Sequence, residues 1–149
     1  MSIKMAQKDT ILGYNYNDYD LYSNQFIPLV NHADLLDRIN IQALLDKHFS
    51  GGAICHLNVE ERITNVEDMM ELIEYSAEKG VVYFAINYLI LKCENGHMTV
   101  GKTNICSICG AKITDEFTRV VGFLTNTKNW HKVRRTVDKP NRVFYKGIK

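Results

Sequence analysis

Apolar residues between positions 33 and 49 recur at the spacing of one face of an α-helix. The members of this face are Leu35, Leu36, Ile39, Leu45 and Phe49. Asn31 with Asp34 can cap the first turn, because short polar side chains accept hydrogen bonds from the free backbone N–H groups there. Ser50 and the two glycines after it end the pattern. We therefore predict an amphipathic helix over residues 33–49.

Two apolar stretches flank a second helical pattern. Residues 53–59 are short, apolar and partly β-branched, as strands are, and residues 81–91 resemble a buried parallel strand interrupted by Asn87. Between them, Thr64 to Glu67 has the pattern of a capping box, and Gly80 ends the helix. Its apolar positions are Val66, Met69, Met70, Ile73 and Ala77. Strand, helix and strand in this order predict a βαβ unit with a right-handed crossover, and so an α/β fold.

The chain changes character after Leu91, where Lys, Asn, Gly, Thr and Cys replace the apolar pattern. We expect residues 1–91 to form the α/β segment and residues 92–115 an irregular, metal-held lobe. Residues 116–149 are expected to form a loop and a C-terminal tail. No internal repeat, low-complexity segment or linker is evident in the sequence.

Composition indicates a folded protein, since 46% of the 149 residues are apolar and 10% are aromatic. The sequence contains no run of eighteen apolar residues and no signal-peptide pattern, which argues against a membrane protein. Three of the four cysteines lie in one short window with a histidine. That grouping favours a metal site in a reducing compartment over disulfides, and we expect a cytoplasmic protein.

The net charge of +1 hides an asymmetry. Residues 128–149 hold eight Lys or Arg and one acid, Asp138, which leaves a net charge of −6 on the rest of the chain. A basic tail can bind nucleic acid, nucleotide phosphates or an acidic protein surface, and it can equally be a solvated tail.

Cys93, His97, Cys106 and Cys109 have the spacing Cys-x3-His-x8-Cys-x2-Cys. Tight turns at Gly96 and Gly110 would bring these ligands together, and three thiolates with one imidazole favour a tetrahedral, structural Zn²⁺. Free thiols beside an unrelated histidine are the simpler alternative. An iron–sulfur cluster is a further alternative, although it usually takes four cysteines. No helix suited to the major groove is obvious after Cys109, which argues against a nucleic-acid-binding zinc finger.

A glycine stands in the hydrophobic segment RVVGFLT at residues 119–125. Four motifs precede it in order: GYNY at 13–16, LYSNQFIPL at 21–29, SGGAICH at 50–56 and CENGHM at 93–98. Together these segments resemble the C-terminal, glycyl-radical-bearing part of the anaerobic (class III) ribonucleoside-triphosphate reductases. The resemblance extends over most of the chain, from about residue 10 to residue 145.

The resemblance implies that Gly122 carries an unpaired electron on its Cα, and that an activase generates it with S-adenosylmethionine and an iron–sulfur cluster. It also implies that residues 1–91 form part of a glycyl-radical-enzyme barrel, followed by a zinc-ribbon-like lobe and an irregular radical loop. The family's nucleotide-sensing domain and most of its barrel, including the cysteine that attacks the ribonucleoside triphosphate, would lie outside this chain. Arg119 is expected to orient the loop and Phe123 to shield it from solvent.

Three functional interpretations remain open from the sequence. The chain can be a fragment or split subunit of the reductase that is inactive alone. It can be a spare part that replaces a damaged radical domain, or a zinc-held binding module without radical chemistry. A glycine in a hydrophobic segment is also commonly a packing or turn residue.

Cys55 is the one cysteine outside the metal cluster. It lies in an expected strand, where a buried structural thiol is commoner than a catalytic one. His56 should point to the opposite face of that strand, so the two residues should not form a nucleophile–base pair. The tyrosines at positions 14, 16, 19 and 22 suit aromatic packing better than a radical relay.

Overall fold

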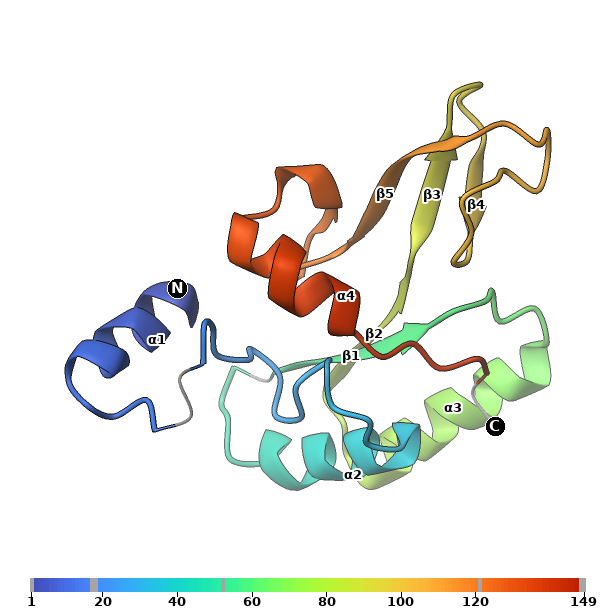
Figure 1. Ribbon diagram of the computed structural model, residues 1–149. Helices are drawn as coiled ribbons and strands as arrows, with labels where there is room; N and C mark the ends of the chain where they lie inside the picture. The colour runs from blue at the N-terminus through green and yellow to red at the C-terminus, as the bar shows by residue number, and fades with distance from the viewer. Residues whose placement is uncertain (1, 17–18, 52, 121, 148–149) are drawn as a thin grey trace.

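The computed structural model describes residues 2–16, 19–51, 53–120 and 122–147 (Figure 1). The helices are α1 (Ser2–Ile11), α2 (Leu35–Asp46), α3 (Val66–Lys79) and a short α4 (Lys139–Asn141). The strands are β1 (Ile54–Val59), β2 (Tyr83–Tyr88), β3 (Ile90–Cys93), β4 (Met98–Val100), β5 (Ile113–Arg119) and β6 (Leu124–Asn126). A 3-10 turn at Thr127–Asn129 and a π-helical turn at Arg134–Asp138 precede α4.

Strands β1 and β2 pair in parallel and are joined by α3, which confirms the predicted βαβ unit. Helices α2 and α3 lie together below these strands in Figure 1. Between the helices and the strands lies the buried apolar core, formed by Leu35, Ile39, Cys55, Leu57 and Leu72. Because side chains alternate along a strand, Cys55 and Leu57 point to the same face of β1, which is the face that packs against α2 and α3.

Both predicted helices are capped, with one change at each N-terminus. The Asp34 side chain accepts from Leu36 N–H at 2.7 Å, as expected, whereas Asn31 caps the turn before it by accepting from Ala33 N–H. Asn65, and not Thr64, caps α3. Gly80 ends α3 with φ 89°, a left-handed conformation that glycine adopts without steric cost.

The expectation of one strand over residues 81–91 is wrong. The chain leaves β2 after Tyr88 and enters β3 at Ile90, which belongs to a separate antiparallel sheet of order β4-β3-β5-β6. Residues after Leu91 are therefore less irregular than expected. The missed signal is the sequence of β5, where Ile113, Thr114, Phe117 and Thr118 give the β-branched and aromatic content of a strand.

The apolar face expected on α3 is also wrong. Val66, Met70 and Ile73 are 74%, 48% and 42% exposed, while Leu72 and Ser76 are the buried residues of this helix. Within the described part of the chain, α3 thus leaves an apolar stripe open to solvent. On α2 the buried face includes Arg38, Gln42 and Asp46 beside the two core residues.

The basic C-terminal segment is not a solvated tail where the structure describes it. It returns to the βαβ unit, where Tyr145 forms a parallel bridge with Val59 and donates its N–H to Asn58 O at 2.9 Å. The Tyr145 hydroxyl also accepts from Arg38 Nε of α2 at 2.6 Å. The segment therefore packs as a structural element beside β1. None of the described helices is long and apolar enough to cross a membrane.

Candidate metal centre and Gly122 hairpin

The four residues predicted as metal ligands converge in space. One ligand atom from each of Cys93, His97, Cys106 and Cys109 lies within 4.8 Å of all the others. Cys93 Sγ and Cys109 Sγ are 3.9 Å apart. A tetrahedral Zn²⁺ with Zn–S bonds of about 2.3 Å places its sulfur ligands about 3.8 Å apart, so this spacing fits zinc.

Two turns with left-handed glycines bring the ligands together, as the sequence indicates. Gly96 has φ 83° and donates its N–H to Cys93 O at 2.9 Å, and Gly110 has φ 72° and donates to Cys106 O at 2.9 Å. The two turns are tied together because Glu94 N–H donates to Lys112 O at 3.1 Å. The backbone thus forms two knuckles that face one another.

The donor atoms suit a metal in their chemistry as well. His97 Nδ1 is buried and has no hydrogen-bond partner among the described residues, so a metal bound there would satisfy it. The backbone N–H of Ala111, helped by the side chains of Asn95 and His97, lowers the pKa of Cys109 to about 6. Burial raises the pKa of Cys93. A cysteine binds a metal as the thiolate, and the lowered pKa of Cys109 favours that form.

Gly122 lies at the turn between β5 and β6. Val120 N–H donates to Phe123 O at 3.2 Å across the turn, and the last residue of β5, Arg119, pairs with the first residue of β6, Leu124. The metal cluster lies at the opposite end of β5, which has seven residues and so spans roughly 20 Å at about 3.3 Å per residue. A metal at that distance can hold the hairpin's base but cannot touch Gly122. Val121 of the RVVGFLT segment lies outside the described residues.

Nothing in the packing of the described residues requires glycine at position 122. A Cβ added there would meet no atom within 4 Å outside its chain neighbours. The interpretation of Gly122 as a packing residue therefore finds no contact to support it within this part of the chain.

Of the two residues expected to act on Gly122, Arg119 contacts it and Phe123 is largely exposed. Arg119 Nη1 donates to Gly122 O at 2.5 Å, which agrees with an orienting role. Phe123 is 78% exposed and Leu124 is 49% exposed, so Phe123 does not shield Gly122 within the described chain, contrary to expectation. Gly122 itself is half-buried.

Cys55 and His56 point to opposite faces of β1, as predicted. Cys55 packs in the core with α2 and α3, and burial raises the pKa of its thiol to about 12. His56 is 1% exposed, and neither ring nitrogen has a partner among the described residues. Burial, with Arg142 and Arg119 nearby, lowers the pKa of His56 to about 4, so its ring is neutral at pH 7. Of the tyrosines, Tyr14 and Tyr16 are exposed, while Tyr19 and Tyr22 form an edge-on pair.

A cavity of about 690 Å³ lies between the loop of residues 19–32 and the C-terminal segment. Its charged lining comes from Asp20, Arg134, Asp138 and Arg142. Neither the metal ligands nor Gly122 line this cavity, so it is separate from the residues that the sequence predicts to be functional.

Sequence reasoning missed a set of buried polar residues around the C-terminal end of β5, next to the hairpin turn. They are Asn58, Asn87, Thr118, Asp138 and Arg142, each no more than 7% exposed. Asn87 was visible in the sequence as the polar interruption of an apolar stretch, and such a residue must find hydrogen-bond partners when it is buried.

Comparison with known proteins agrees with this geometry. The family model described as anaerobic ribonucleoside-triphosphate reductase matches residues 1–145. One solved anaerobic ribonucleotide reductase is 38% identical, with a TM-score of 0.84, over 97% of this chain and 23% of its own length. The Thermotoga maritima anaerobic ribonucleotide reductase with glycerol in the active site is 36% identical, with a TM-score of 0.74, over 93% of this chain and 22% of its own. The Thermotoga maritima enzyme in complex with dATP and CTP is also 36% identical, with a TM-score of 0.74, over 90% and 22%.

A search of curated proteins gave no match. The chain spans less than a quarter of the length of the solved enzymes it matches. Identity above 35% over nearly the whole chain, together with the family match, confirms the resemblance seen in the sequence. The chain therefore belongs to the anaerobic ribonucleoside-triphosphate reductase family, and it corresponds to the C-terminal region of these oxidoreductases.

Proposed function

We propose that Gly122 stores the radical that starts ribonucleotide reduction in a reductase of this family. The observation that carries the proposal is the place of Gly122 at the tip of the β5–β6 hairpin, where Arg119 holds its carbonyl oxygen. A glycine Cα can become planar without a side chain crowding it, and no other residue type offers this.

In the proposed activation, the Cα–H bond of Gly122 breaks and the hydrogen atom leaves with one electron for the activase. One unpaired electron stays behind, shared by the Cα, the donating amide nitrogen and the withdrawing carbonyl. The Arg119 guanidinium favours electron density on the carbonyl oxygen to which it donates. The hydrogen bond therefore supports the delocalised form of the spin as well as the position of the loop.

In the complete enzyme the Gly122 radical would take a hydrogen atom from a cysteine of the barrel, which forms the Cα–H bond again and leaves a thiyl radical. The thiyl would take the 3′ hydrogen of a ribonucleoside triphosphate, and the 2′ hydroxyl would leave as water, with formate or a thiol system as reductant. This chain supplies the first of these steps. The remaining steps belong to the part of the reductase outside it, so the chain alone is expected to be inactive.

We also propose that Cys93, His97, Cys106 and Cys109 hold a structural Zn²⁺. The donor set, the 3.9 Å sulfur spacing and the free Nδ1 of His97 support this proposal. All four positions of a tetrahedron are filled by protein, so the ion would hold the two knuckles together and leave no place for water. β3 ends at Cys93 in the first knuckle, and β5 begins at Ile113, just after the second knuckle. Such an ion would therefore fix the sheet that carries the hairpin.

The remainder of the reductase is the proposed partner, and the exposed apolar surface supports this. Exposed apolar side chains lie at the hairpin tip and along α3, where a partner surface would remove them from water. They are Phe123, Leu124, Val66, Met70 and Ile73. A thiol-rich metal site and an oxygen-sensitive radical suit a reducing, oxygen-free cytoplasm.

Anoxic activation followed by electron paramagnetic resonance tests the proposal. The chain is mixed with the remainder of the reductase and an activase, and a doublet from one hydrogen-bearing carbon radical is expected. Gly122→Ala should abolish the doublet, and Gly51→Ala should not, since a Cβ at Gly51 also meets nothing within 4 Å. A zinc-held binding module would show no doublet in any of these proteins, and that outcome would overturn the proposal.

A further inference from the structure

The β1–β2 pair has one apolar face and one polar face, and β1 is buried on both. Cys55 and Leu57 point into the core, whereas His56 and Asn58 of β1 and Asn87 of β2 lie on the other face, each 1% exposed. A buried amide is unfavourable unless its hydrogen bonds are made. The partners of Asn58 and Asn87 therefore show what this face is built to hold.

Asn58 and Asn87 are register partners across the parallel strands, and their side chains are linked. Asn87 Nδ2 donates to Asn58 Oδ1 at 2.7 Å, and Asn58 Nδ2 donates to Val143 O at 3.0 Å. Asn87 Oδ1 accepts from Thr118 Oγ1 at 3.0 Å and from Arg119 N–H at 3.1 Å. Because an N–H must face an oxygen, the Arg119 amide fixes which way the Asn87 carboxamide is turned.

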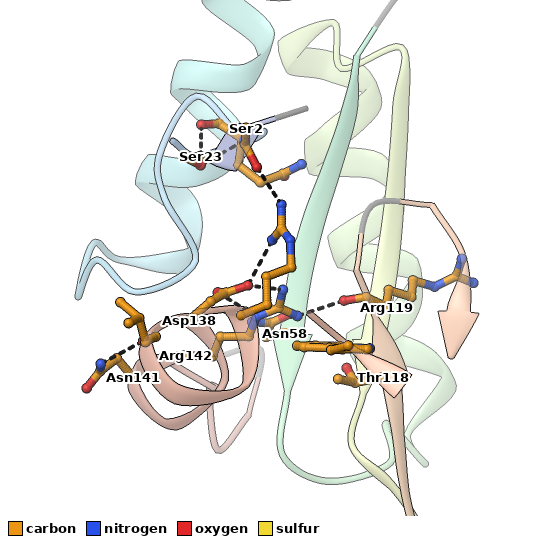
Figure 2. Close-up of polar contacts among 12 residues, drawn as sticks. Ser2, Ser23, Asn58, Thr118, Arg119, Asp138, Asn141 and Arg142 are labelled. Carbon is orange, nitrogen blue, oxygen red and sulfur yellow. Dashed lines mark hydrogen bonds and ion pairs between the residues drawn. The ribbon is translucent and has the colours of Figure 1, made fainter. Parts of the chain in front are cut away.

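Arg119 is the last residue of β5 before the turn that holds Gly122, and it is held on both sides. Its N–H donates to Asn87. Its carbonyl oxygen accepts from Arg142 Nη1 at 2.7 Å, as Figure 2 shows. Its own guanidinium donates to Gly122 O. Two side chains from other elements therefore fix the main chain of Arg119. The Arg119 side chain in turn fixes the carbonyl oxygen of Gly122.

Arg142 is itself fixed in place. Its Nε and Nη2 donate to the two carboxylate oxygens of Asp138 at 3.0 and 2.9 Å, and its guanidinium lies 4.7 Å from the centre of the Trp130 ring. Its side chain is only 1% exposed. This bidentate, stacked arrangement is rigid, whereas the contacts of Asn87 with the hairpin are two neutral hydrogen bonds.

We propose that Asn87 is a positioning residue for the radical chemistry, and that with Arg142 it sets the place to which Gly122 returns after activation. The inference rests on the proposed function, because it assigns a role relative to the Gly122 radical. Access of an activase to Gly122 then requires the two neutral hydrogen bonds to Asn87 to open, together with the bond from Arg142 to the Arg119 carbonyl oxygen. Asn87 lies on the parallel β1–β2 pair, so the two bonds to it define one closed position of the hairpin when they form again.

The test uses the chain assembled with the remainder of the reductase. Asn87→Leu removes the acceptor for Arg119 N–H, Asn87→Asp keeps an acceptor oxygen there, and Thr118→Val removes only the neighbouring hydroxyl donor. Spins per chain are counted after anoxic activation, and deoxynucleotide formed is divided by spins. We expect Asn87→Leu to lower product per spin by about tenfold to a hundredfold, since a small misplacement of a reacting centre has an effect of this size. Asn87→Asp should recover part of the loss, because a carboxylate accepts from Arg119 N–H but cannot donate to Asn58 Oδ1. Thr118→Val should stay within about threefold of the parent.

A residue that only stabilises the fold would lower the melting temperature and leave product per spin unchanged, and that result would overturn the inference. If the parent protein gives no doublet, the proposed function fails, but hydrogen exchange still tests the contact. In the parent protein the Arg119 amide should be among the slowest to exchange in residues 113–126. In Asn87→Leu it should exchange at least tenfold faster. If that variant does not fold, the same acceleration is expected in the parent protein when activase is added. An Arg119 amide that exchanges as fast as exposed amides would also overturn the inference.

Discussion

Nη1 of Arg119 donates a hydrogen bond of 2.5 Å to the carbonyl oxygen of Gly122, across the turn that joins β5 to β6. The contact links a charged donor to the one backbone carbonyl that would share the spin of a radical at Gly122. It also places a half-buried guanidinium at the hairpin tip, where the neighbouring Phe123 is largely exposed. The arrangement makes Arg119 the first side chain to alter in order to test how Gly122 is held.

Arg119→Met should lower the yield of the radical. Removing one partner of a hydrogen bond to a charged group costs about 1.5–3 kcal/mol, and the partial exposure of Arg119 favours the lower end. We expect spins per chain after anoxic activation to fall at least fivefold, measured by electron paramagnetic resonance. Arg119→Lys keeps a positive donor and should fall less. Equal yields from the Met variant and the parent would show that the contact has no part in radical storage.

Oxygen should cut the activated chain at the proposed radical residue. A carbon-centred radical adds O₂ rapidly, and the peroxyl that forms leads to cleavage of the main chain beside the carbon. Brief exposure of the activated protein to air should therefore give two fragments that meet at residue 121 or 122, which mass spectrometry can resolve. The Gly122→Ala protein, treated in parallel, should stay intact. An intact parent chain after a confirmed doublet would place the spin elsewhere.

Removal of a cluster cysteine should release the metal and loosen the hairpin sheet. Cys106 is 2% exposed and donates its N–H to Ala111 O at 2.8 Å within its knuckle, so Cys106→Ser changes a ligand in a fixed position. We expect about one zinc per chain in the parent protein and less than about a tenth of that in the variant, measured by elemental analysis. The melting temperature should fall as well, because binding energy at a structural zinc site is folding energy.

Cys55→Ala is the matched control for the metal experiment. Cys55 is equally buried but lies in the core against α2 and α3, and burial raises its pKa to about 12, so it is a neutral thiol at pH 7. The variant should keep its zinc and lose only the stability of a small core truncation. Zinc retained by Cys106→Ser but lost by Cys55→Ala would contradict the assignment of the ligands.

The sequence predicted the elements whose signals are local. The βαβ unit follows from two apolar stretches and a helix with a capping residue, and Gly80 marks the end of that helix because only glycine adopts φ 89° without strain. The convergence of Cys93, His97, Cys106 and Cys109 follows from their spacing. Each of these features depends on residues close together in the chain, so a single sequence carries enough information to find it.

The features that sequence reasoning missed depend on contacts between distant segments. The apolar stripe of α3 pointed to Val66 and Ile73 as core residues, but the described chain leaves both exposed because it lacks a surface to cover them. The bond between Asn87 and Arg119 joins residues 32 positions apart, and Arg142 reaches Arg119 over 23 positions. No periodic pattern encodes such pairs, and they appear only when β2, β5 and the C-terminal segment are placed together.

His56 should make the protein sensitive to acid. Its pKa is lowered from 6.5 to about 4, first by burial and then by Arg142 and Arg119, while in the unfolded chain it returns to about 6.5. Below pH 6.5 the unfolded state takes up a proton that the folded state refuses, so stability falls as pH drops and the fall ends near pH 4. Between pH 7 and pH 4.5 the loss from this one group should be about 2–3 kcal/mol.

Comparison of His56→Leu with the parent isolates this effect, because acid also releases any bound metal and titrates carboxylates in both proteins. The difference between their unfolding free energies, from denaturant titrations at pH 4.5 and pH 7, should change by about 2–3 kcal/mol in favour of the variant at the lower pH. At pH 7 the variant should be no less stable than the parent, since leucine fills a similar volume and removes two ring nitrogens without partners among the described residues. His48→Gln, at an exposed position, should follow the parent at both pH values. A pH-independent difference between His56→Leu and the parent would mean that folding does not change the pKa of His56, and its neutral burial would then be wrong.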